Sequence, residues 1–275
     1  MKELPTIVVT GASSGIGAYC ARALKAEGWR VFATARGAKA LAALEADGIE
    51  AFHLDYAEAA SIERLVACVL ERTGGSLDAL YNNGAYAQAG AVEDMPVEAL
   101  RRQFEANFFG WHDLTRRVVA VMRRQGHGRI VHCSSILGMM PLPYRGAYCA
   151  SKYALEGLML SLRQELDGSG IHVSLIEPGP VASNLYDNGF SVFSGAIDSE
   201  RSFHRRSYER ELEQVRSGRG RKRAGPDVVY KALRHALLSP RPRPHYVVTL
   251  PARIGILLKR ILPASLLYRL LAKST

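Results

Sequence analysis

Residues 6–27 restrict the fold of this chain more than any other segment. An apolar, β-branched run, TIVVT (6–10), is followed by GASSGIG (11–17) and by helical periodicity from Ala18 to Glu27. A buried strand, a glycine-rich turn and a helix in this order are typical of dinucleotide binding. Glycines let the main chain approach a pyrophosphate, and the helix N-terminus offers free N–H donors. The alternative is a glycine-rich turn that binds nothing.

Strand and helix patterns alternate along the rest of the chain. Strands are expected near residues 6–10, 30–34, 50–54, 77–81, 129–133, 172–176 and 245–248. This alternation predicts an α/β fold of the Rossmann type, a doubly wound parallel sheet of about seven strands with helices on both faces. With 275 residues, 48% of them hydrophobic, the chain can bury one large core. Residues 1–250 are therefore expected to form a single domain, followed by an amphipathic extension at 251–275.

Tyr148 and Lys152 lie four residues apart in YCASKYALEGL, which places them one turn apart on the same face of a helix. A free phenol has a pKa near ~10, and an ammonium fixed beside it favours the phenolate and lowers that pKa. The pair therefore suits proton transfer to or from an oxygen atom. Because such pairs also occur by chance on helix surfaces, its meaning depends on the other motifs.

Together these motifs resemble the short-chain dehydrogenase/reductase family, over the chain up to about residue 190. In order they are TGASSGIG (10–17), LD (54–55), NNGA (82–85), EANFFGWHDL with Asn107, IVHCSSILG with Ser135, YCASK (148–152) and PGPVAS (178–183). The family usually shows NNAG where this chain has NNGA, a change that could shift the main chain below the cofactor. The resemblance implies hydride transfer between a nicotinamide and a carbonyl or alcohol.

The resemblance also implies four catalytic residues. Tyr148 would be the general acid/base, and Lys152 would lower its pKa and hold the nicotinamide ribose. Ser135 would hydrogen-bond the substrate oxygen, since the family's usual spacing to the tyrosine selects it over Ser134. Asn107 would keep a water in the proton relay; alternatively it is a buried asparagine that satisfies helix backbone groups.

The end of the second strand indicates the cofactor. NAD-binding Rossmann proteins carry an acid there, whereas this chain has Ala35 followed by Arg36. A guanidinium can bind a 2′-phosphate through two hydrogen bonds, so NADP(H) is expected, with a solvent-facing Arg36 as the alternative. The resemblance places Asp55 at the adenine edge, Asn83 on the ribose side, and Val181 and Ser183 at the carboxamide. The full expected cofactor set is Gly11, Ser13, Ser14, Gly15, Ile16, Gly17, Arg36, Asp55, Asn83, Tyr148, Lys152, Pro178, Gly179, Val181 and Ser183.

Within the family, YCASKYALEGL, IEPGPV and the basic C-terminal extension look most like 17β-hydroxysteroid and retinol dehydrogenases and related bacterial reductases. An apolar substrate is expected, of the steroid, retinoid or fatty aldehyde type, with reduction as the direction. The candidate pocket residues are mostly apolar: Leu137, Met139, Met140, Leu142, Tyr144, Leu185, Tyr186, Phe190 and Phe193. The alternative is a non-catalytic NADP-binding sensor or scaffold, which loss of the catalytic residues would have favoured.

Positive charge is concentrated in two segments. Residues 201–223 contain nine Lys and Arg against three Glu, within an expected substrate lid at about 184–223. A helix is expected near 198–216, and a solvated, mobile lid is the simplest interpretation. Residues 241–275 contain seven Lys and Arg and no acid. Their apolar stretches at 254–262 and 266–271 are too short to span a bilayer; they would lie on an anionic membrane surface, cover the cleft or form an oligomer interface.

Other classes are disfavoured. The eight histidines show no metal-ligand spacing, and no nucleic-acid recognition motif accompanies the basic charge, so neither a metal nor nucleic acid is expected. The first strand begins too early for a signal peptide, and the cysteines lack CxxC spacing. A cytoplasmic protein is therefore expected, with the membrane surface as the alternative. The family usually forms dimers or tetramers through the helices of Asn107 and Tyr148, so a homo-oligomer is expected. The four cysteines are Cys20, Cys68, Cys133 and Cys149.

Overall fold

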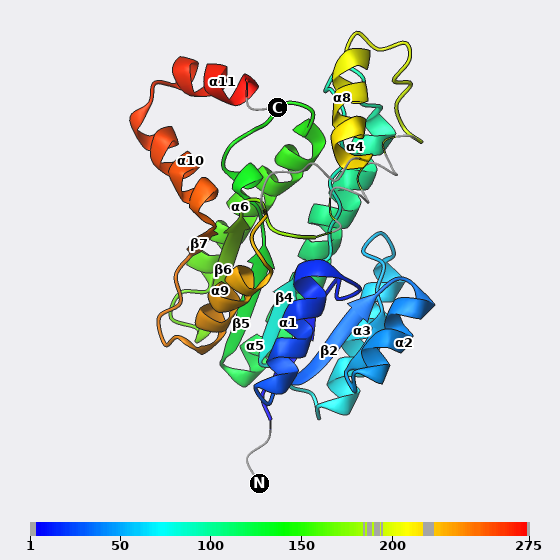
Figure 1. Ribbon diagram of the computed structural model, residues 1–275. Coiled ribbons are helices and arrows are strands. Elements are labelled where there is room, and N and C mark those ends of the chain that lie inside the picture. The colour runs from blue at the N-terminus through cyan, green and yellow to red at the C-terminus, as the bar shows by residue number, and fades with distance from the viewer. Residues whose placement is uncertain are drawn as a thin grey trace.

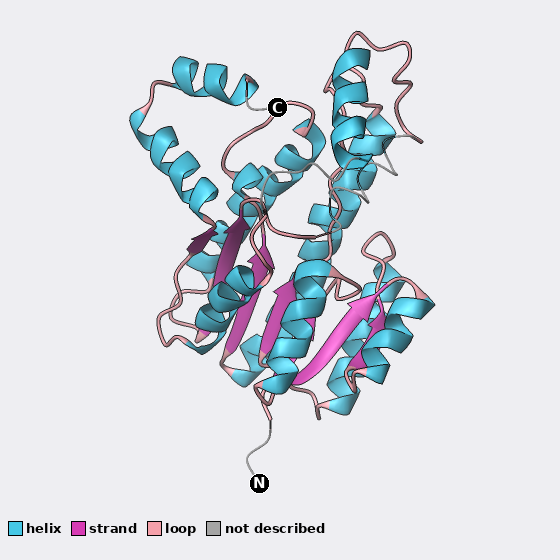
Figure 2. Ribbon diagram, in the orientation of Figure 1, coloured by secondary structure: helices cyan, strands magenta, loops and turns pink. Residues whose placement is uncertain are grey.

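The computed structural model describes residues 4–183, 185, 189, 193, 195–216 and 223–273. Within them, seven parallel strands form one sheet in the order β3-β2-β1-β4-β5-β6-β7 (Figures 1 and 2). Each expected strand is present, with ends shifted by two residues at most. The strands are β1 (Thr6–Val9), β2 (Arg30–Ala35), β3 (Glu50–His53), β4 (Ala79–Asn82), β5 (Gly128–Cys133), β6 (Ile171–Pro178) and β7 (His245–Val248).

Helices cover both faces of the sheet (Figure 1). One face carries α1 (Gly15–Ala26), α2 (Ala38–Ala46) and α9 (Asp227–Leu238), and the other carries α3 (Ala59–Arg72), α5 (Gly110–Gln125) and α6 (Gly146–Glu165). Residues on both sides of a strand are consequently buried: Ile7, Val8 and Val9 are all at most 2% exposed. This double burial explains why the central strands are rich in apolar residues.

The order in which strands are added to the sheet reverses at β1. Val8 pairs with Phe32 of β2 on one side and with Leu80 of β4 on the other. After β1 the chain passes to the face of α1, and after the neighbouring β4 it passes to the face of α5. A crevice therefore opens at the carboxyl ends of β1 and β4, which is where ligands bind in open parallel sheets.

The helix expected near residues 198–216 is shorter in the structure. Helix α8 (Arg205–Arg216) begins later than residue 198, and its described part is packed against the domain. Tyr208 is buried; it donates a 2.5 Å hydrogen bond to Asp94 and accepts one from the main chain of Ala91. Arg145 binds both oxygens of Glu211 at 3.1 Å. These contacts hold one side of α8 against the domain. Most of the basic run 219–223 lies outside the described residues.

The C-terminal extension consists of two short helices, α10 (Leu250–Ile261) and α11 (Ala264–Ala272), which project beyond the carboxyl edge of the sheet (Figure 1). Pro263 separates them. Helix α10 contacts the loop after β5, where the Lys259 ammonium donates to the carbonyl of Met139. None of the described helices is long and apolar enough to cross a membrane.

Candidate active site

A cleft of about 200 Å³ lies at the carboxyl ends of the central strands and collects most of the expected site residues. Its wall contains Ser135 and every expected cofactor residue except Gly17. Gly17 lies behind the wall, where helix α1 meets the glycine turn. A Cβ on Gly17 would lie 2.3 Å from the carbonyl oxygen of Gly11, so only glycine lets the helix approach this closely.

The glycine turn is held from below by the turn after β4. The Thr10 hydroxyl accepts hydrogen bonds from the main-chain N–H groups of Asn83 (2.8 Å) and Gly84 (3.2 Å). The Asn83 carboxamide donates at 3.2 Å to the carbonyls of Thr10 and Gly11. Asn83 therefore lines the cleft and also fixes the shape of the glycine turn.

The transposed NNGA motif has a local explanation. Gly84 faces Gly11, and a Cβ at position 84 would lie 3.1 Å from the Gly11 nitrogen and 3.3 Å from the Tyr56 ring. The usual alanine would be tight there, although small shifts could accommodate it. The next residue, Ala85, lines the cleft.

The start of α1 suits an anion. Ser14 is its N-cap and makes no side-chain capping bond, and the first turn contains no acidic residue. Gly15 has a φ of +55°, which brings the main chain close to the cleft. The free N–H groups and the helix dipole together favour a phosphate at this point. The residues present thus fit a dinucleotide.

Arg36 follows β2 directly and lies exposed at the rim of the cleft. Within the described part of the chain its guanidinium makes no hydrogen bond or ion pair, so it is available to a ligand. Asp55 also lines the cleft; its carboxylate accepts a 3.0 Å bond from the N–H of Ala57 and shapes the turn after β3.

Tyr148 and Lys152 are both buried on α6, with the Lys152 Nζ 5.8 Å from the centre of the Tyr148 ring. The Lys152 ammonium donates to the carbonyl of Cys133 at 2.8 Å and lies 4.0 Å from the centre of the Trp111 ring. Burial lowers the pKa of Lys152 to about 8, while Cys133 and Glu156 oppose this shift. The ammonium therefore remains charged at neutral pH beside the phenol.

The two neighbouring serines face different surroundings. The Ser135 hydroxyl oxygen accepts a 3.1 Å hydrogen bond from the N–H of Leu137, so its hydrogen can be donated into the cleft. Ser134 is also at the cleft wall, but its hydroxyl is buried close to Glu156. The geometry suits Ser135 better for contact with a ligand oxygen.

Asn107 lies outside the cleft wall, in a π-helical turn (Glu105–Phe109) between α4 (Val97–Phe104) and α5. It is fully buried; its Oδ1 accepts from the N–H of Tyr86 at 3.2 Å and its Nδ2 donates to the Tyr86 carbonyl at 2.9 Å. Both ends of the carboxamide thus hold the loop that lines the cleft. Asn107 thus satisfies main-chain groups of that loop, whereas the alternative considered from the sequence was that it satisfies main-chain groups of a helix.

Sequence reasoning missed several supporting residues. Trp111 is fully buried, donates from Nε1 to the Gly84 carbonyl at 2.9 Å, and presents its ring to Lys152. It follows Asn107 by four residues, and this helical spacing was the available signal. Tyr56 donates to Thr10 at 2.8 Å, joining the turns after β3 and β1, and no local pattern indicates that contact.

Apolar side chains surround Tyr148. Tyr148 and Leu137 belong to one buried apolar cluster, against which Leu142 and Leu185 pack, and Leu185 also lines the cleft. Other expected pocket residues lie elsewhere: Tyr144 and Phe193 pack with Tyr208 of α8, and Met140 contacts α10. Tyr186 and Phe190 lie outside the described residues.

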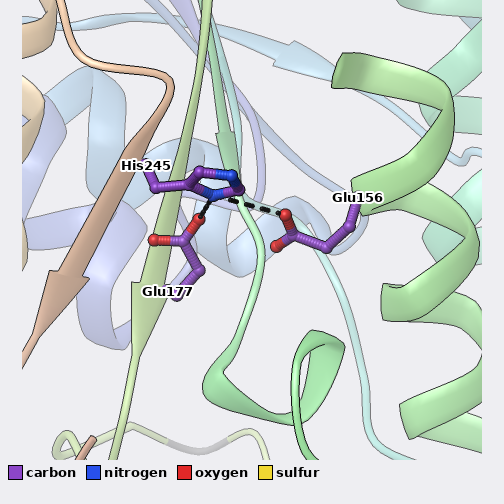
Figure 3. Close-up of side chains that lie close together, drawn as sticks. All are labelled: Glu156, Glu177 and His245. Atoms are coloured by element: carbon purple, nitrogen blue, oxygen red, sulfur yellow. Dashed lines mark hydrogen bonds and ion pairs between the residues drawn. The ribbon is translucent and has the colours of Figure 1, made fainter. Parts of the chain in front are cut away.

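Glu156, Glu177 and His245 converge next to the site from α6, β6 and β7 (Figure 3). One donor atom from each lies within 4.8 Å of the others. Local spacing along the sequence could not predict this cluster, because its three residues come from three separate elements.

Parallel strands whose order reverses at a glycine-lined cleft, with a buried tyrosine and lysine at its base, are typical of nucleotide-dependent oxidoreductases. The family model described as short chain dehydrogenase matches residues 5–191. The chain therefore belongs to the short-chain dehydrogenase/reductase family.

Relatives match over nearly the whole chain. An uncharacterized oxidoreductase of Escherichia coli K12, YbbO, is 35% identical over 266 residues, covering 97% of this chain and 93% of that protein. Mouse 17-beta-hydroxysteroid dehydrogenase type 1 is 32% identical over 265 residues, covering 89% and 74% respectively. The steroid-dehydrogenase resemblance seen in the sequence thus has a counterpart among the relatives.

Solved structures show the same architecture. A short-chain dehydrogenase from Streptomyces avermitilis has a TM-score of 0.76 at 31% identity, covering 94% of this chain and 96% of that one. A variant of actinorhodin polyketide ketoreductase with NADPH has a TM-score of 0.72 at 30% identity, covering 90% and 97%. A Burkholderia phymatum member in complex with NAD, at 23% identity and TM-score 0.81 with coverage of 94% and 93%, shares the fold.

Proposed function

We propose that this oxidoreductase uses NADP(H) to reduce an apolar ketone or aldehyde, with Tyr148 as the general acid. The observation that carries the proposal is the buried pair on α6, in which the Lys152 ammonium lies 5.8 Å from the Tyr148 ring at the base of the cleft. A buried ammonium stabilises the phenolate that forms when the tyrosine gives up its proton.

The chain's own residues would act on the substrate oxygen. Tyr148 donates its phenolic proton to that oxygen, and Ser135 donates a hydrogen bond that stabilises the negative charge developing there. Lys152, held by the Cys133 carbonyl and the Trp111 ring, stabilises the resulting phenolate. The bound cofactor supplies the hydride. In the reverse direction the phenolate takes the proton from an alcohol.

The cofactor would be held at both halves of the cleft. The glycine turn and the first N–H groups of α1 suit its pyrophosphate, and the exposed Arg36 at the rim suits a 2′-phosphate. Asp55 would contact the adenine edge. The ribose and nicotinamide side would be formed by Asn83, Lys152, Pro178, Gly179, Val181 and Ser183. The related polyketide ketoreductase is described with NADPH, which agrees with this choice.

An apolar substrate suits the surroundings of Tyr148, where Leu137, Leu142 and Leu185 form an apolar wall. Ketosteroids, retinal and fatty aldehydes are largely apolar molecules that carry a carbonyl group. The name of the mouse relative, a 17-beta-hydroxysteroid dehydrogenase, supports a ligand of this class.

The C-terminal helices would bring the protein to an anionic membrane surface from which apolar substrates are taken. Leu250, Ile254, Leu257 and Ile261 follow one face of α10 and are 70%, 47%, 58% and 65% exposed. The opposite side of α10 packs against the domain, where Ala252 is buried and Gly255 lies next to Met140. Residues 241–275 carry basic groups and no acid, a charge that complements anionic lipids.

Copies of the chain would associate through α5 and α6 to form a dimer or tetramer. Tyr153 of α6 and Phe109, just before α5, are 41% and 50% exposed on these helices. Exposed aromatic side chains on long helices are suitable contacts between identical subunits.

The test is the oxidation of NADPH, and separately NADH, followed by absorbance with retinal, a 17-ketosteroid and long-chain aldehydes. Turnover with NADPH that falls at least ~100-fold in Tyr148→Phe supports the mechanism. Tyr153→Phe, an exposed tyrosine of the same helix, is the matched control and should keep wild-type rates. Unchanged turnover in Tyr148→Phe would refute the assignment, whereas NADPH binding without turnover of any carbonyl would favour the sensor or scaffold.

A further inference from the structure

The row of buried ionisable side chains on α6 continues beyond Lys152. Tyr148, Lys152 and Glu156 follow one another at intervals of four residues and are only 3%, 1% and 7% exposed. Residues at this spacing share one helix face. Glu156 is therefore a buried carboxylate one turn beyond Lys152, in a row that the proposed mechanism uses only as far as the lysine.

Three side chains converge beneath the loop after β5. A Cβ on Gly138 would lie 3.0 Å from the Ser134 hydroxyl oxygen, 3.1 Å from Cγ of Glu156 and 3.2 Å from Cβ of Lys152. Among the described residues, neither carboxylate oxygen of Glu156 receives a hydrogen bond of normal length. A buried carboxylate in this situation interacts with its neighbours chiefly through its charge.

The cationic partner of this carboxylate comes from β7 (Figure 3). Nδ1 of His245 lies 2.7 Å from Oε1 of Glu177 and 3.6 Å from Oε2 of Glu156. Glu177 is held further by the N–H of Tyr246 at 2.9 Å. The His245 side chain is 32% exposed, so it connects this buried pair of carboxylates to solvent. Arg163 on α6 adds a positive charge near the histidine.

The charges of these groups depend on one another. Burial, and then the charge of Glu177, raises the pKa of Glu156 to about 7, whereas a hydrogen bond with Ser134 and the charges of His245 and Lys152 lower it. The hydrogen bond to Glu177 raises the pKa of His245. A protonated His245 therefore allows both carboxylates to be ionised, which two buried acids without a cation could not be.

Lys152 needs such an opposing charge. In the described part of the chain its ammonium donates to one carbonyl and lies near the rings of Trp111 and Tyr148, and no carboxylate lies within ion-pair distance of it. Burial alone would favour the neutral amine. The charge of Glu156, one turn away, acts against this loss.

We propose that Glu156 is a positioning residue that keeps Lys152 charged, and that His245, held by Glu177, keeps Glu156 ionised. The catalytic consequence rests on the proposed function, in which Lys152 acts on Tyr148. The same three groups could instead bind a divalent cation. The 2.7 Å nitrogen–oxygen contact is that of a hydrogen bond, and the nearby ammonium opposes a further positive charge, so we assign the cluster to proton sharing.

The direct test is the titration of Lys152 in the cofactor-free protein labelled with ¹³C-lysine, with the resonance assigned through Lys152→Met. Glu156→Gln should lower the pKa of Lys152 by about one unit or more, because a nearby charge is removed at almost constant volume. Glu165→Gln, an exposed acid on the same helix, is the matched control and should leave it unchanged. An unaltered Lys152 titration in a folded Glu156→Gln protein overturns the proposal.

His245→Gln provides a second variant, which also serves if Glu156→Gln does not fold. It should also lower the pKa of Lys152, because Glu156 would no longer be kept ionised. The pKa of Lys152 in the double variant should differ little from that in either single variant. Additive shifts would argue against a common path through Glu156. Stoichiometric bound metal in the purified protein would also overturn the assignment to proton sharing.

Kinetics separate this inference from the proposed function. The alkaline limb of kcat/KM should move to lower pH in Glu156→Gln and remain in place in Glu165→Gln. If the Lys152 pKa shifts while no carbonyl is reduced, the proposed function fails and the role of Glu156 stands. If Tyr148-dependent turnover is present without any shift in the Lys152 pKa, the role of Glu156 fails alone.

Discussion

Gly11 and Gly84 meet main chain to main chain beneath the cleft: a Cβ on Gly11 would lie 2.3 Å from the Cα of Gly84. Gly11 also has a φ of +62°, a conformation that residues with side chains rarely adopt. The contact joins the turn after β1 to the turn after β4. The order of strands in the sheet reverses between these two strands. This close contact therefore contributes to the shape of the cofactor cleft, together with the hydrogen bonds of Asn83 and Thr10.

Alanine at these two positions should have unequal effects. Gly11→Ala combines an unfavourable φ with a main-chain clash, so we expect a loss of at least ~2 kcal/mol in the free energy of unfolding and no measurable NADPH binding. Gly84→Ala restores the residue usual in the family and meets atoms at 3.1–3.3 Å, so a cost below ~1.5 kcal/mol is expected. Chemical denaturation and fluorescence titration with NADPH measure both. Equal effects would show that the close approach does not matter.

Arg36 should decide between the two cofactors. Arg36→Ala is expected to raise the KM for NADPH by about 10- to 100-fold, since a charged hydrogen bond to phosphate is lost. The KM for NADH should change less than ~3-fold, because that cofactor lacks the phosphate. Steady-state kinetics with both cofactors make the comparison, and Lys39→Ala, another exposed cation nearby on α2, is the control. A parallel rise for NADPH and NADH would remove Arg36 from the 2′-phosphate site.

The titration of Lys152 should limit activity at high pH. Burial lowers the pKa of this lysine to about 8, so it is charged below that pH and increasingly neutral above it. Reduction requires the charged form, and kcat/KM should consequently fall as the pH rises through about 8. A pH profile of kcat/KM from 6 to 10 at saturating NADPH measures this limb. A profile that stays flat to pH 10 would contradict the role of the ammonium.

The exposed face of α10 should be required for membrane binding. Leu257→Asp combined with Ile261→Asp places two charges in the apolar stripe, and we expect at least ~10-fold weaker binding to vesicles containing phosphatidylserine. Binding should weaken further with salt and be low on phosphatidylcholine alone. Flotation assays with Leu238→Asp as the control test this, because Leu238 is 51% exposed at the end of α9. If the wild-type protein does not float with either vesicle, the helices serve another contact.

Local patterns predicted the sheet and much of the cleft for a physical reason. Strands buried on both faces are rich in apolar residues, and Thr6–Val9 is an example. Ile171–Pro178 is also largely apolar, but it carries the buried polar side chains Ser174 and Glu177. The helix predicted from 198 in fact begins at Arg205, since its position depends on contacts such as that of Tyr208 with Asp94, which lie far apart in the sequence.

The sequence by itself determined the parallel α/β fold, the glycine turn and the spacing of Tyr148 and Lys152, because each depends on neighbours within a turn or a strand. The tertiary structure alone decided that Trp111 supports Lys152, that the Asn107 carboxamide holds the Tyr86 loop, and that His245 reaches Glu156. These contacts arise from the order of strands in the sheet, which brings distant segments to the same edge and which no local spacing records.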